Sequence, residues 1–583
     1  MWKQILEIDL SSQKSRVLEE EELFHRTMGG TAAGTHLLER YCDPSIDPFD
    51  AGNPIILSIG PFSNILPVAT KTVALFKSPH TGELGESHAG GRLAMALYNA
   101  GFSAIVIIGA AREPVFLNIY NDQVEFLHAG SLWGYSSSAT ERVLRGRDIG
   151  AGGKRSILRI GPAGERLSTY ACATVDTQRH FGRLGLGAVM GSKKLKAMVI
   201  GGNRYLTVPD KKKFKKYYDS LYDTVVASGE MKKYHDLGTA GNILALNKIQ
   251  GLPTRNFSQG WFEGSEQISG EVFGNDHLSR QIACAHCQCG CIHLATLREQ
   301  FHKEHGFKTF QVSYDFELIY ALGTNLSIND PKCILKLLHK TEKEGWDAMS
   351  VGVTLAWATD AFLGGLIGTD ETDGLVLRFG DAETYLESME KMSRHATPFY
   401  KDLEKGAAAC SRIYGGEDAA ICFGGNEGAG YITGENAFTD WIVGVRHSHL
   451  DGAGYSIDQA LLKADMSLED QTKKLASEAK FRMLLNSLVI CLFARNIYKP
   501  EIIKEGLDLL WRPCAQDELD AFCSDTLRRK YEFKIKCGWN PNEINLPKRL
   551  TEVITTTGKV NPENIRRRAG IYWKEIGLTT RRS

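Results

Sequence analysis

Four cysteines are gathered into eight residues of this chain, in the stretch CAHCQCGC that begins at Cys284. Cys284, Cys287 and Cys291 follow the spacing C-x2-C-x3-C, which lets three thiolates of one loop bind a single inorganic centre. A structural zinc site normally adds a second pair of Cys or His about 12 to 20 residues along, but the next cysteine, Cys333, stands alone. The spacing therefore favours an iron–sulfur cluster with a remote fourth ligand over zinc. Cys289 is either an unligated thiol or a substitute for a neighbouring ligand.

Two further residues have side chains suited to acid–base chemistry. Glu317 lies in YDFELIYALG, where apolar neighbours would shield its carboxyl group from water and raise its pKa. Such a group suits a general acid or base, although an exposed position on an amphipathic helix is the alternative. His449 lies in VRHSHLDGAGY. It could donate a hydrogen bond to a substrate oxygen, join His447 in a His-x-His-x-Asp metal site, or be a hydrogen-bonded core residue.

Glycines and arginines occur together in RHFGRLGLGAVMG. Gly185, Gly187 and Gly191 give G-x-G-x3-G, which is one residue longer than the dinucleotide-binding fingerprint. With Arg179 and Arg183 beside them, these glycines could still hold another phosphate, because bare backbone approaches the anion while guanidinium groups neutralise it. The alternative is a tight turn packed against a sheet. The earlier HAGG stretch has the same two interpretations.

The composition limits the class of protein. With 583 residues, 43% of them hydrophobic, the chain can form two or three domains. Its 69 Lys and Arg equal its 69 Asp and Glu, so no nucleic-acid-binding surface is expected. The apolar runs are far shorter than the ~20 residues that span a bilayer, and MWKQILEIDL lacks the apolar stretch of a signal peptide. Thirteen scattered cysteines suit a reducing compartment. We expect a soluble, cytoplasmic protein without membrane insertion.

The character of the sequence changes near residue 205. Residues 1–205 carry short β-rich runs such as PIILSIG, KTVALF and SAIVIIG between glycine-rich turns, which predicts a sheet-based domain. Helical periodicity begins with KKKFKKYYDSLYDTVV, whose lysines we interpret as a solvated helix face rather than a docking patch. Glycines near residue 410 indicate a second boundary. The predicted fold is α+β, with a β-sheet-rich domain at 1–205 and two mainly α-helical domains at 206–410 and 411–583.

Several stretches occur in the order in which one protein family has them. They are KSPHTGELGESHAGGRLAMALYNAGFSAIVIIGAAREPVFLNI, RHFGRLGLGAVMGSKKLKAMVI, the cysteine loop, LLNSLVICLF and INLPKRLTEV. In this ordered set the chain resembles the tungsten-dependent aldehyde:ferredoxin oxidoreductases. The resemblance implies a [4Fe-4S] cluster in which Cys491, from LLNSLVICLF, is the remote ligand beside Cys284, Cys287 and Cys291.

The resemblance also implies that the domains enclose a tungsten bis-pyranopterin, or its molybdenum counterpart. The phosphates would lie against the N-terminal stretches, and the pterin rings would be held by the turns EKEGWD and NSLVIC. The residues implied to bind this cofactor are Lys71, His88, Ala89, Gly90, Gly91, Arg179, Phe181, Gly182, Arg183, Glu342, Asp347 and Asn486.

This chain departs from the family at several of these positions. Lys71 stands where an arginine is usual and His88 where an asparagine is usual, in a stretch that helps the family hold magnesium between the pterin phosphates. Asn486 replaces a carboxylate in the second turn. Some members bridge two subunits with iron held by a Glu-x-x-His turn. Lys336 and His339 occupy that turn here, so a homodimer would lack bridging iron.

The function implied by the resemblance is oxidation of an aldehyde to a carboxylic acid in an anaerobic setting. Glu317 would manage the proton, and His449 would bind the substrate oxygen. Two electrons would leave through the cluster to ferredoxin or to an iron–sulfur electron-transfer subunit. Three alternatives stay open: the tungsten subunit of a class II benzoyl-CoA reductase, a zinc-dependent hydrolase using His447 and His449, and a scaffold that has lost the pterin.

Overall fold

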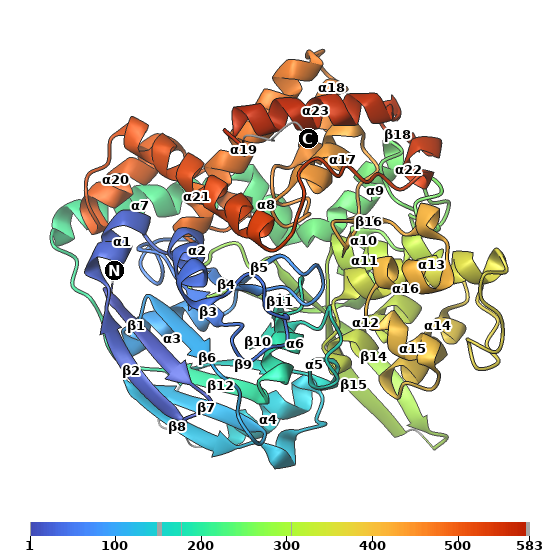
Figure 1. The fold of residues 1–583 in the computed structure, drawn as a ribbon, viewed down its shortest axis with the longest axis horizontal. Coiled ribbons are helices and arrows are strands. Elements are labelled where there is room, and N and C mark those ends of the chain that lie inside the picture. Colours follow the sequence, from blue (N-terminus) through green and yellow to red (C-terminus); the bar gives the residue numbers. More distant parts are fainter. Residues whose placement is uncertain (1, 148–153, 177, 305, 579–583) are drawn as a thin grey trace. The chain divides into compact units, whose positions relative to one another are not determined.

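The computed structural model of the protein describes residues 2–147, 154–176, 178–304 and 306–578 (Figure 1). The described chain forms two compact units, and each unit is assembled from separate stretches of sequence. The first unit contains Met1–His235, Ala283–Gly290 and Lys480–Trp539. The second unit contains Asp236–Ile282, Cys291–Ala479 and Asn540–Ser583. Most of the cysteine loop and the segment around Cys491 therefore belong to the N-terminal unit.

The first unit contains two mixed six-stranded sheets. The first sheet has the order β2-β1-β6-β3-β4-β5 and consists of β1 Gln4–Asp9, β2 Lys14–Glu19, β3 Ile55–Ser58, β4 Thr72–Lys77, β5 Leu84–Ala89 and β6 Ala104–Ile108. The second has the order β11-β10-β9-β12-β7-β8 and consists of β7 Val115–Tyr120, β8 Gln123–His128, β9 Ser156–Ile160, β10 Ala173–Val175, β11 Arg179–Phe181 and β12 Leu195–Gly201. Each sheet has one parallel pair, β1 with β6 and β7 with β12.

The two sheets share one hydrophobic core. Leu6 and Ile105 of the first sheet and Leu158 and Met198 of the second belong to a single cluster of buried apolar side chains. The run AIVII in β6 is buried along nearly its whole length, as expected for a strand that is covered on both faces. The predicted β-sheet-rich N-terminal domain is confirmed.

Helices from the C-terminal part of the chain complete the first unit. Its helices are α1 Glu21–Thr27, α2 Gly30–Tyr41, α3 Leu93–Ala100, α4 Ser137–Gly146, α5 Pro162–Glu165, α6 Leu186–Ser192, α7 Lys211–Ala227, α20 Pro500–Leu510 and α21 Gln516–Lys536, with most of α8 Gly229–Asp236 and the end of α19 Leu468–Ser487. Figure 1 shows red α21 beside blue α2, where Arg529 and Glu39 form an ion pair at 2.9 Å. Lys530 of α21 is buried and pairs with Glu86 of β5. Since a buried charge is costly without a partner, this pair fixes α21 on β5.

The second unit is mainly helical, as predicted. Its helices are α9 Asn242–Lys248, α10 Gly270–Val272, α11 Phe316–Leu322, α12 Pro331–Glu344, α13 Ala348–Leu363, α14 Ala382–Ser393, α15 Pro398–Leu403, α16 Ala407–Tyr414, α17 Glu435–Val443, α18 Gly454–Leu461, α22 Arg549–Glu552 and α23 Pro562–Glu575. Its strands form the antiparallel sheet β13 Leu278–Ile282, β14 Ile292–His302 and β15 Gly306–Tyr314, and the two-stranded pairs β16 Cys422–Phe423 with β17 Asn426–Glu427 and β18 Ile554–Thr555 with β19 Gly558–Lys559.

Helices α12 and α13 are separated by a short turn. Gly345 ends α12 with a left-handed φ of 81°, a conformation that glycine adopts without steric cost. Asp347 then caps α13, because its carboxylate accepts from the backbone N–H groups of Met349 at 3.1 Å and Ser350 at 3.3 Å. The stretch EKEGWD therefore spans the last turn of α12 and the short turn that leads into α13.

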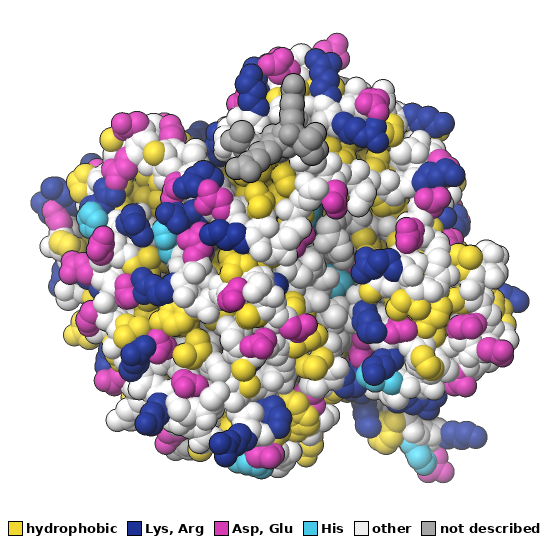
Figure 2. All heavy atoms as spheres, viewed as in Figure 1, with side chains coloured by type: hydrophobic (Ala, Val, Ile, Leu, Met, Phe, Trp, Pro, Cys, Tyr) yellow, Lys and Arg dark blue, Asp and Glu magenta, His cyan; other side chains and the backbone are white. Residues whose placement is uncertain are grey.

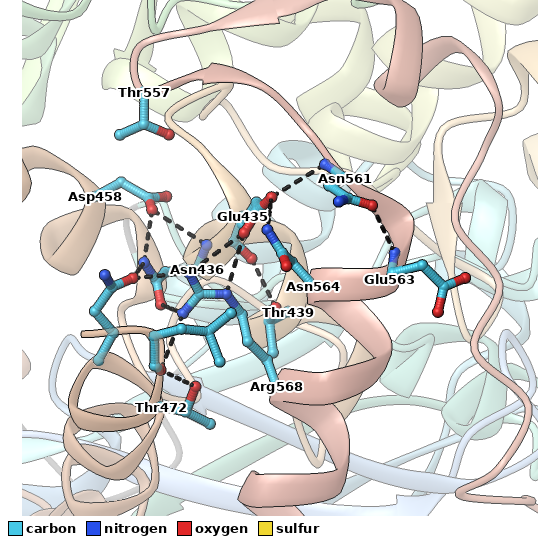
Figure 3. Close-up of polar contacts among 12 residues, drawn as sticks. Glu435, Asn436, Thr439, Asp458, Thr472, Thr557, Asn561, Glu563, Asn564 and Arg568 are labelled. Atoms are coloured by element: carbon cyan, nitrogen blue, oxygen red, sulfur yellow. Dashed lines mark hydrogen bonds and ion pairs between the residues drawn. The ribbon is translucent and has the colours of Figure 1, made fainter. Parts of the chain in front are cut away.

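A buried polar network ties the C-terminal helix α23 into the second unit (Figure 3). The Arg568 guanidinium donates to Asn436 Oδ1 at 3.0 Å and to Gln471 Oε1 at 2.8 Å. It also pairs with Glu435 at 3.3 Å. Asn436 in turn donates its backbone N–H to Asp458 at 3.1 Å, and burial raises the pKa of Asp458 despite such hydrogen bonds. These contacts connect α17, α18, α19 and α23.

The surface carries charges of both signs. On the face drawn in Figure 2, Lys and Arg side chains are interspersed with Asp and Glu. This pattern agrees with the equal numbers of basic and acidic residues, 69 of each. Among the described residues, no helix combines the length and the apolar character needed to cross a bilayer.

The α23 network gives a stability prediction. We expect Arg568→Ala to lower the free energy of unfolding by about 2–4 kcal/mol, because Glu435 and Asn436 would stay buried without their cationic partner. Urea denaturation and amide hydrogen exchange over 562–575 measure the effect. The matched control is Arg566→Ala on the same helix, since Arg566 is 57% exposed and its pair with Glu563 contributes little. Equal destabilisation by both variants would contradict the assignment.

Candidate functional site

Backbone hydrogen bonds bring the cysteine loop and Cys491 to the same residue of the first unit. The N–H of Val68 donates to the carbonyl oxygen of His286 at 2.9 Å, and the carbonyl oxygen of Val68 accepts from the N–H of Cys491 at 3.0 Å. His286 lies between Cys284 and Cys287 in sequence. One residue from early in the chain therefore joins the loop to a segment some two hundred residues later.

The backbone around this junction is strained. Val68, His286 and Val489 have positive φ values of 63°, 58° and 55°. A left-handed conformation is rare for any residue with a side chain and rarer still for β-branched valine. Each such residue costs about 1–3 kcal/mol and persists only where its surroundings impose it. Val489 is held there because its carbonyl oxygen accepts from the N–H of Lys71 at 3.2 Å.

The Cys284 sulfur lies against the HAGG stretch. The backbone N–H of Gly91 donates to Cys284 Sγ at 3.2 Å. A Cβ atom at Gly90 would lie 2.6 Å from that sulfur and 3.5 Å from Lys71 Nζ, so only glycine fits there. Hydrogen bonds from the backbone to a thiolate sulfur are a recognised way of setting the potential of an iron–sulfur cluster. The role of Cys284 as a cluster ligand stays a prediction.

The other loop cysteines differ in their surroundings. Cys289 is buried, its thiol donates to the carbonyl oxygen of Met231 at 3.5 Å, and its own carbonyl oxygen contacts His235 Nδ1 at 2.9 Å. Cys287 is only partly buried. These contacts favour Cys289 as a packing residue. Cys291 is counted with the second unit, and its role as a ligand stays a prediction.

Glycine, lysine and arginine residues of the predicted phosphate site meet between β5 and β11. These two strands contact each other. A Cβ atom at Gly91, where φ is 91°, would lie 3.3 Å from Asp176 Oδ2 and 3.7 Å from Arg179 Cγ. Phe181 is fully buried, and Gly182 and Arg183 follow directly after β11. Bare backbone beside cationic side chains suits a bound phosphate.

The His88 side chain is engaged by a buried carboxylate. Its Nε2 lies 2.8 Å from Glu86 Oε1, and the other oxygen of Glu86 accepts from the Thr31 hydroxyl at 2.8 Å and pairs with Lys530. A carboxylate with these partners fixes the orientation of the imidazole ring. Sequence reasoning did not find Glu86 or Lys530, because their contact joins β5 to a helix near the end of the chain.

The turn NSLVIC is packed tightly and leaves one buried donor unsatisfied. A Cβ atom at Gly30 would lie 2.3 Å from the carbonyl oxygen of Asn486, and one at Gly60 would lie 2.5 Å from that of Ser487. Asn486 is 4% exposed, and its side-chain Nδ2 has no hydrogen-bond partner within the part of the chain that the structure describes. An unsatisfied buried donor costs about 1–3 kcal/mol. A bound group with an acceptor at this position, such as a pterin ring, would satisfy it.

The turn EKEGWD lies in the second unit. Both carboxylate oxygens of Asp347 are used in capping α13, and Oδ2 also accepts from the Ser350 hydroxyl at 2.6 Å. A carboxylate has about four acceptor sites, so further donors can still bind. Glu342 is partly buried on the last turn of α12. The predicted pterin contacts of Glu342 and Asp347 stay predictions.

Glu317 and His449 lie close together in the second unit although 132 positions separate them in the sequence. His449 Nε2 lies 3.3 Å from Glu317 Oε1. The second oxygen, Oε2, accepts from the N–H of Gly430 at 3.1 Å. The side chains are only 18% and 10% exposed for Glu317 and His449. A carboxylate and an imidazole at this separation can exchange a proton or share one with a bound substrate.

Aromatic rings surround this pair. The Tyr431 ring lies 5.3 Å from the His449 ring, 4.2 Å from Tyr455 and 5.2 Å from Phe316, measured between ring centroids. The Thr433 hydroxyl, two residues after Tyr431, donates to Asp458 at 3.0 Å. This hydrogen bond attaches the segment that contains Tyr431 to the α23 network. Sequence reasoning missed Tyr431 and Tyr455, because no local pattern marks either one.

The loop that carries His449 is shaped by a buried ion pair. Asp451 Oδ1 accepts from Arg446 Nε at 2.7 Å, and Asp451 Oδ2 accepts from the N–H groups of Arg446 at 3.0 Å and Ser448 at 3.1 Å. Burial alone would raise the pKa of Asp451, but the Arg446 charge and these hydrogen bonds hold it below its usual value. His447 Nδ1 contacts the carbonyl oxygen of Trp441 at 2.8 Å. Among the described residues, no three His, Cys, Asp or Glu side chains are grouped to hold a metal ion.

The chain matches two family descriptions of known proteins. Residues 5–202 match the family description "Aldehyde ferredoxin oxidoreductase, N-terminal domain", and residues 216–581 match "Aldehyde ferredoxin oxidoreductase, domains 2 & 3". These two matches cover most of the chain. The protein therefore belongs to the aldehyde ferredoxin oxidoreductase family, and it is an oxidoreductase.

Individual relatives agree with this assignment. A tungsten-containing aldehyde ferredoxin oxidoreductase of Thermococcus kodakarensis is 34% identical over 423 residues, which cover 71% of this chain and 67% of that protein. A protein of the same name from Pyrococcus furiosus is 29% identical over 602 residues, covering 99% and 96%. The aliphatic sulfonate oxidoreductase, WOR-like subunit, of Pyrococcus furiosus is 28% identical over 398 residues, covering 65% and 62%.

A solved structure shares the fold. The active site complex BamBC of benzoyl coenzyme A reductase, in complex with 1,5-dienoyl-CoA, matches with a TM-score of 0.84 at 17% identity. The match covers 99% of this chain and 94% of that one. At this identity the likeness concerns the architecture.

The junction at Val68 predicts different roles for two cysteines. We expect Cys491→Ala to lose or shrink the iron–sulfur cluster, because it removes a thiolate beside the loop, whereas Cys289→Ala should keep the full iron content. Iron analysis and visible absorption of anaerobically purified protein measure both. Equal iron loss in the two variants would mean that the ligands are wrongly assigned.

The Arg446–Asp451 pair predicts a pH-dependent stability. Because the folded pKa of Asp451 lies below the 3.8 of an unfolded aspartate, its contribution is complete above about pH 4 and is lost as the pH falls through the folded pKa. We expect Asp451→Asn to lower the free energy of unfolding by about 3 kcal/mol at neutral pH, since Arg446 stays buried. Urea titrations from pH 3 to 7 should show that the difference in the free energy of unfolding between the wild type and Asp451→Asn becomes smaller at acid pH. The exposed Asp465→Asn is the control. A difference that stays constant with pH would contradict the assignment.

Proposed function

We propose that this protein oxidises an aldehyde to a carboxylic acid and passes the electrons through a [4Fe-4S] cluster to ferredoxin or an iron–sulfur partner subunit. The observation that carries the proposal is the shielded pair of Glu317 and His449, assembled from distant segments in a chain of this family. The reaction balances as one aldehyde and one water giving one carboxylic acid, two protons and two electrons. The two electrons would leave one at a time.

The two side chains have complementary tasks in this proposal. Glu317 accepts the proton that is released when the oxygen atom derived from water adds to the carbonyl carbon. The N–H of Gly430 holds the Glu317 carboxylate in position. His449 donates a hydrogen bond to the substrate oxygen as negative charge develops there. The neighbouring ring of Tyr431 restricts the imidazole and helps to exclude water.

The residues of the first unit fit a tungsten bis-pyranopterin, with molybdenum as the alternative metal. Gly90 and Gly91 give a phosphate close access to the backbone, Lys71 and Arg179 supply positive charge, and the Asn486 amide offers an unsatisfied donor. When bound, this cofactor supplies the two-electron redox chemistry that the side chains lack. A magnesium ion between the phosphates belongs to the same proposal.

The class II benzoyl-CoA reductase activity is the second candidate, supported by the fold shared with the BamBC complex. It uses the same scaffold to reduce an aromatic acyl thioester. The relatives named aldehyde ferredoxin oxidoreductases are more similar in sequence, at 29% and 34% identity against 17%. Aldehyde oxidation is therefore preferred.

The cytoplasmic location and any dimer are further parts of the proposal. The ring of His339 lies 4.1 Å from that of Phe310 between centroids, and Lys336 pairs with Glu383 at 3.4 Å. These contacts support a protein whose dimer, if one forms, has no iron at this helix.

The decisive experiment uses protein purified without oxygen. We expect tungsten and iron in a ratio near one to four, and aldehyde-dependent reduction of benzyl viologen. Glu317→Gln should lower kcat roughly 10²–10⁴-fold while the metal content is unchanged, because only the proton acceptor is lost. Zinc without iron or tungsten would overturn the proposal. Turnover of an aryl-CoA with no aldehyde activity would support the second candidate.

A further inference from the structure

Helix α8 packs against the cysteine loop within the first unit. Its Met231 carbonyl oxygen accepts from the Cys289 thiol, and His235 Nδ1 lies 2.9 Å from the Cys289 carbonyl oxygen. At the other side of the helix, Asn496 donates its side-chain amide to Glu230 at 2.8 Å. Helix α8 is therefore bound both to the loop that holds Cys284 and Cys287 and to the segment that follows Cys491.

An aromatic stack lies at this contact. The rings of Tyr234 and Phe493 are 3.9 Å apart between centroids and nearly parallel, with an interplanar angle of 11°. Phe493 comes two residues after Cys491, and both rings are partly exposed. The ammonium group of Lys233 lies 6.0 Å from the Tyr234 ring, at the outer limit of a cation–π contact. The stack thus reaches from the Cys491 segment to the surface.

Three basic residues are close in sequence to the two stacked rings. Lys232 and Lys233 are exposed, and Arg495 is partly exposed. The Arg495 side chain donates to the carbonyl oxygen of Leu492 at 3.0 Å, which keeps the guanidinium on this segment. We call Lys232, Lys233, Tyr234, Phe493 and Arg495 the α8 patch. Helix α8 carries two carboxylates: Glu230, which accepts from Asn496, and the exposed Asp236 at its end.

We propose that the α8 patch is the docking surface for an acidic iron–sulfur protein that receives the electrons. This inference rests on the proposed function, because it takes the cluster predicted at Cys284, Cys287, Cys291 and Cys491 as the electron source. Complementary charge would steer the acidic partner to the patch and raise the rate of encounter. The two aromatic rings would form the desolvated centre of a small, transient interface.

The lysine run on α7 offers a matched comparison. Lys211 and Lys212 are an adjacent exposed pair like Lys232 and Lys233. They lie at the far end of α7, a helix of 17 residues and so about 25 Å long, which ends just before α8. Replacing either pair by glutamate changes the net charge equally. The α8 pair lies on the helix whose Met231 and His235 contact the cysteine loop.

The test uses the metal-loaded enzyme and a small acidic bacterial 2[4Fe-4S] ferredoxin as the probe. We expect Lys232→Glu with Lys233→Glu to raise the KM for this ferredoxin about tenfold and to weaken its binding in calorimetry equally. Benzyl viologen reduction should be unchanged, because a small dye needs no docking surface. Lys211→Glu with Lys212→Glu should leave the ferredoxin KM within about twofold.

A second variant separates charge from contact. Tyr234→Ala keeps the charge and should still weaken ferredoxin binding about tenfold, as the loss of an aromatic anchor does. Equal weakening by both lysine pairs would overturn the patch in favour of a diffuse charge effect. A ferredoxin KM that is unaffected by the α8 variants would overturn the proposed docking surface. Dissociation of a dimer by these variants would also overturn it, because the patch would then be a contact between two copies of this chain. Failure of the proposed function is a separate result, since the wild-type enzyme would then reduce neither dye nor ferredoxin.

Discussion

The two hydrogen bonds on the backbone of Val68 are the constraint on which the first unit depends. They join His286 of the cysteine loop and Cys491 to the N–H and the carbonyl oxygen of one residue, so segments from three parts of the sequence become one structure. The left-handed valines at 68 and 489 show that this geometry is imposed by its surroundings. Close packing at Gly30 and Gly60 leaves the turn that contains Asn486 no room to move away. Strain of this kind is expected where a site must be held ready for a ligand.

The second unit solves a different problem, because it must hold a carboxylate beside an imidazole with little water. Desolvation makes an isolated buried charge expensive, so each ionised group needs a fixed partner. Asp451 and Arg446 supply such a pair within the loop of His449. Asp458 anchors the strand of chain that carries Gly430 and Tyr431. The geometry of the Glu317–His449 pair is therefore supported by buried polar contacts outside the pair.

Features that depend on local sequence patterns could be predicted from the sequence. Alternation and turn residues predicted the sheets, helical periodicity predicted α7, and the spacing of thiols identified the cysteine loop. The sequence could not reveal that Asp451 pairs with Arg446 and shapes the loop of His449, or that Tyr431 stacks on Tyr455, because no local pattern specifies these contacts. In the sequence, the boundary between α12 and α13 is marked by Gly345. Glycine can adopt the left-handed conformation that ends α12, but its presence does not require a helix to end there. The positions of Glu317 and His449 came from family resemblance.

The two units also differ in how far the groups named in the proposed function are exposed. Protons move over short distances along aligned hydrogen bonds, so in that proposal Glu317 and His449 would gain from burial, which strengthens each electrostatic contact. Electrons would pass to another molecule, and the thiols of Cys284, Cys287, Cys291 and Cys491 are only partly buried. Cys289, the buried thiol of the loop, is the one whose contacts are with α8. Burial therefore separates the thiol that packs the loop from the thiols that could serve an electron outlet.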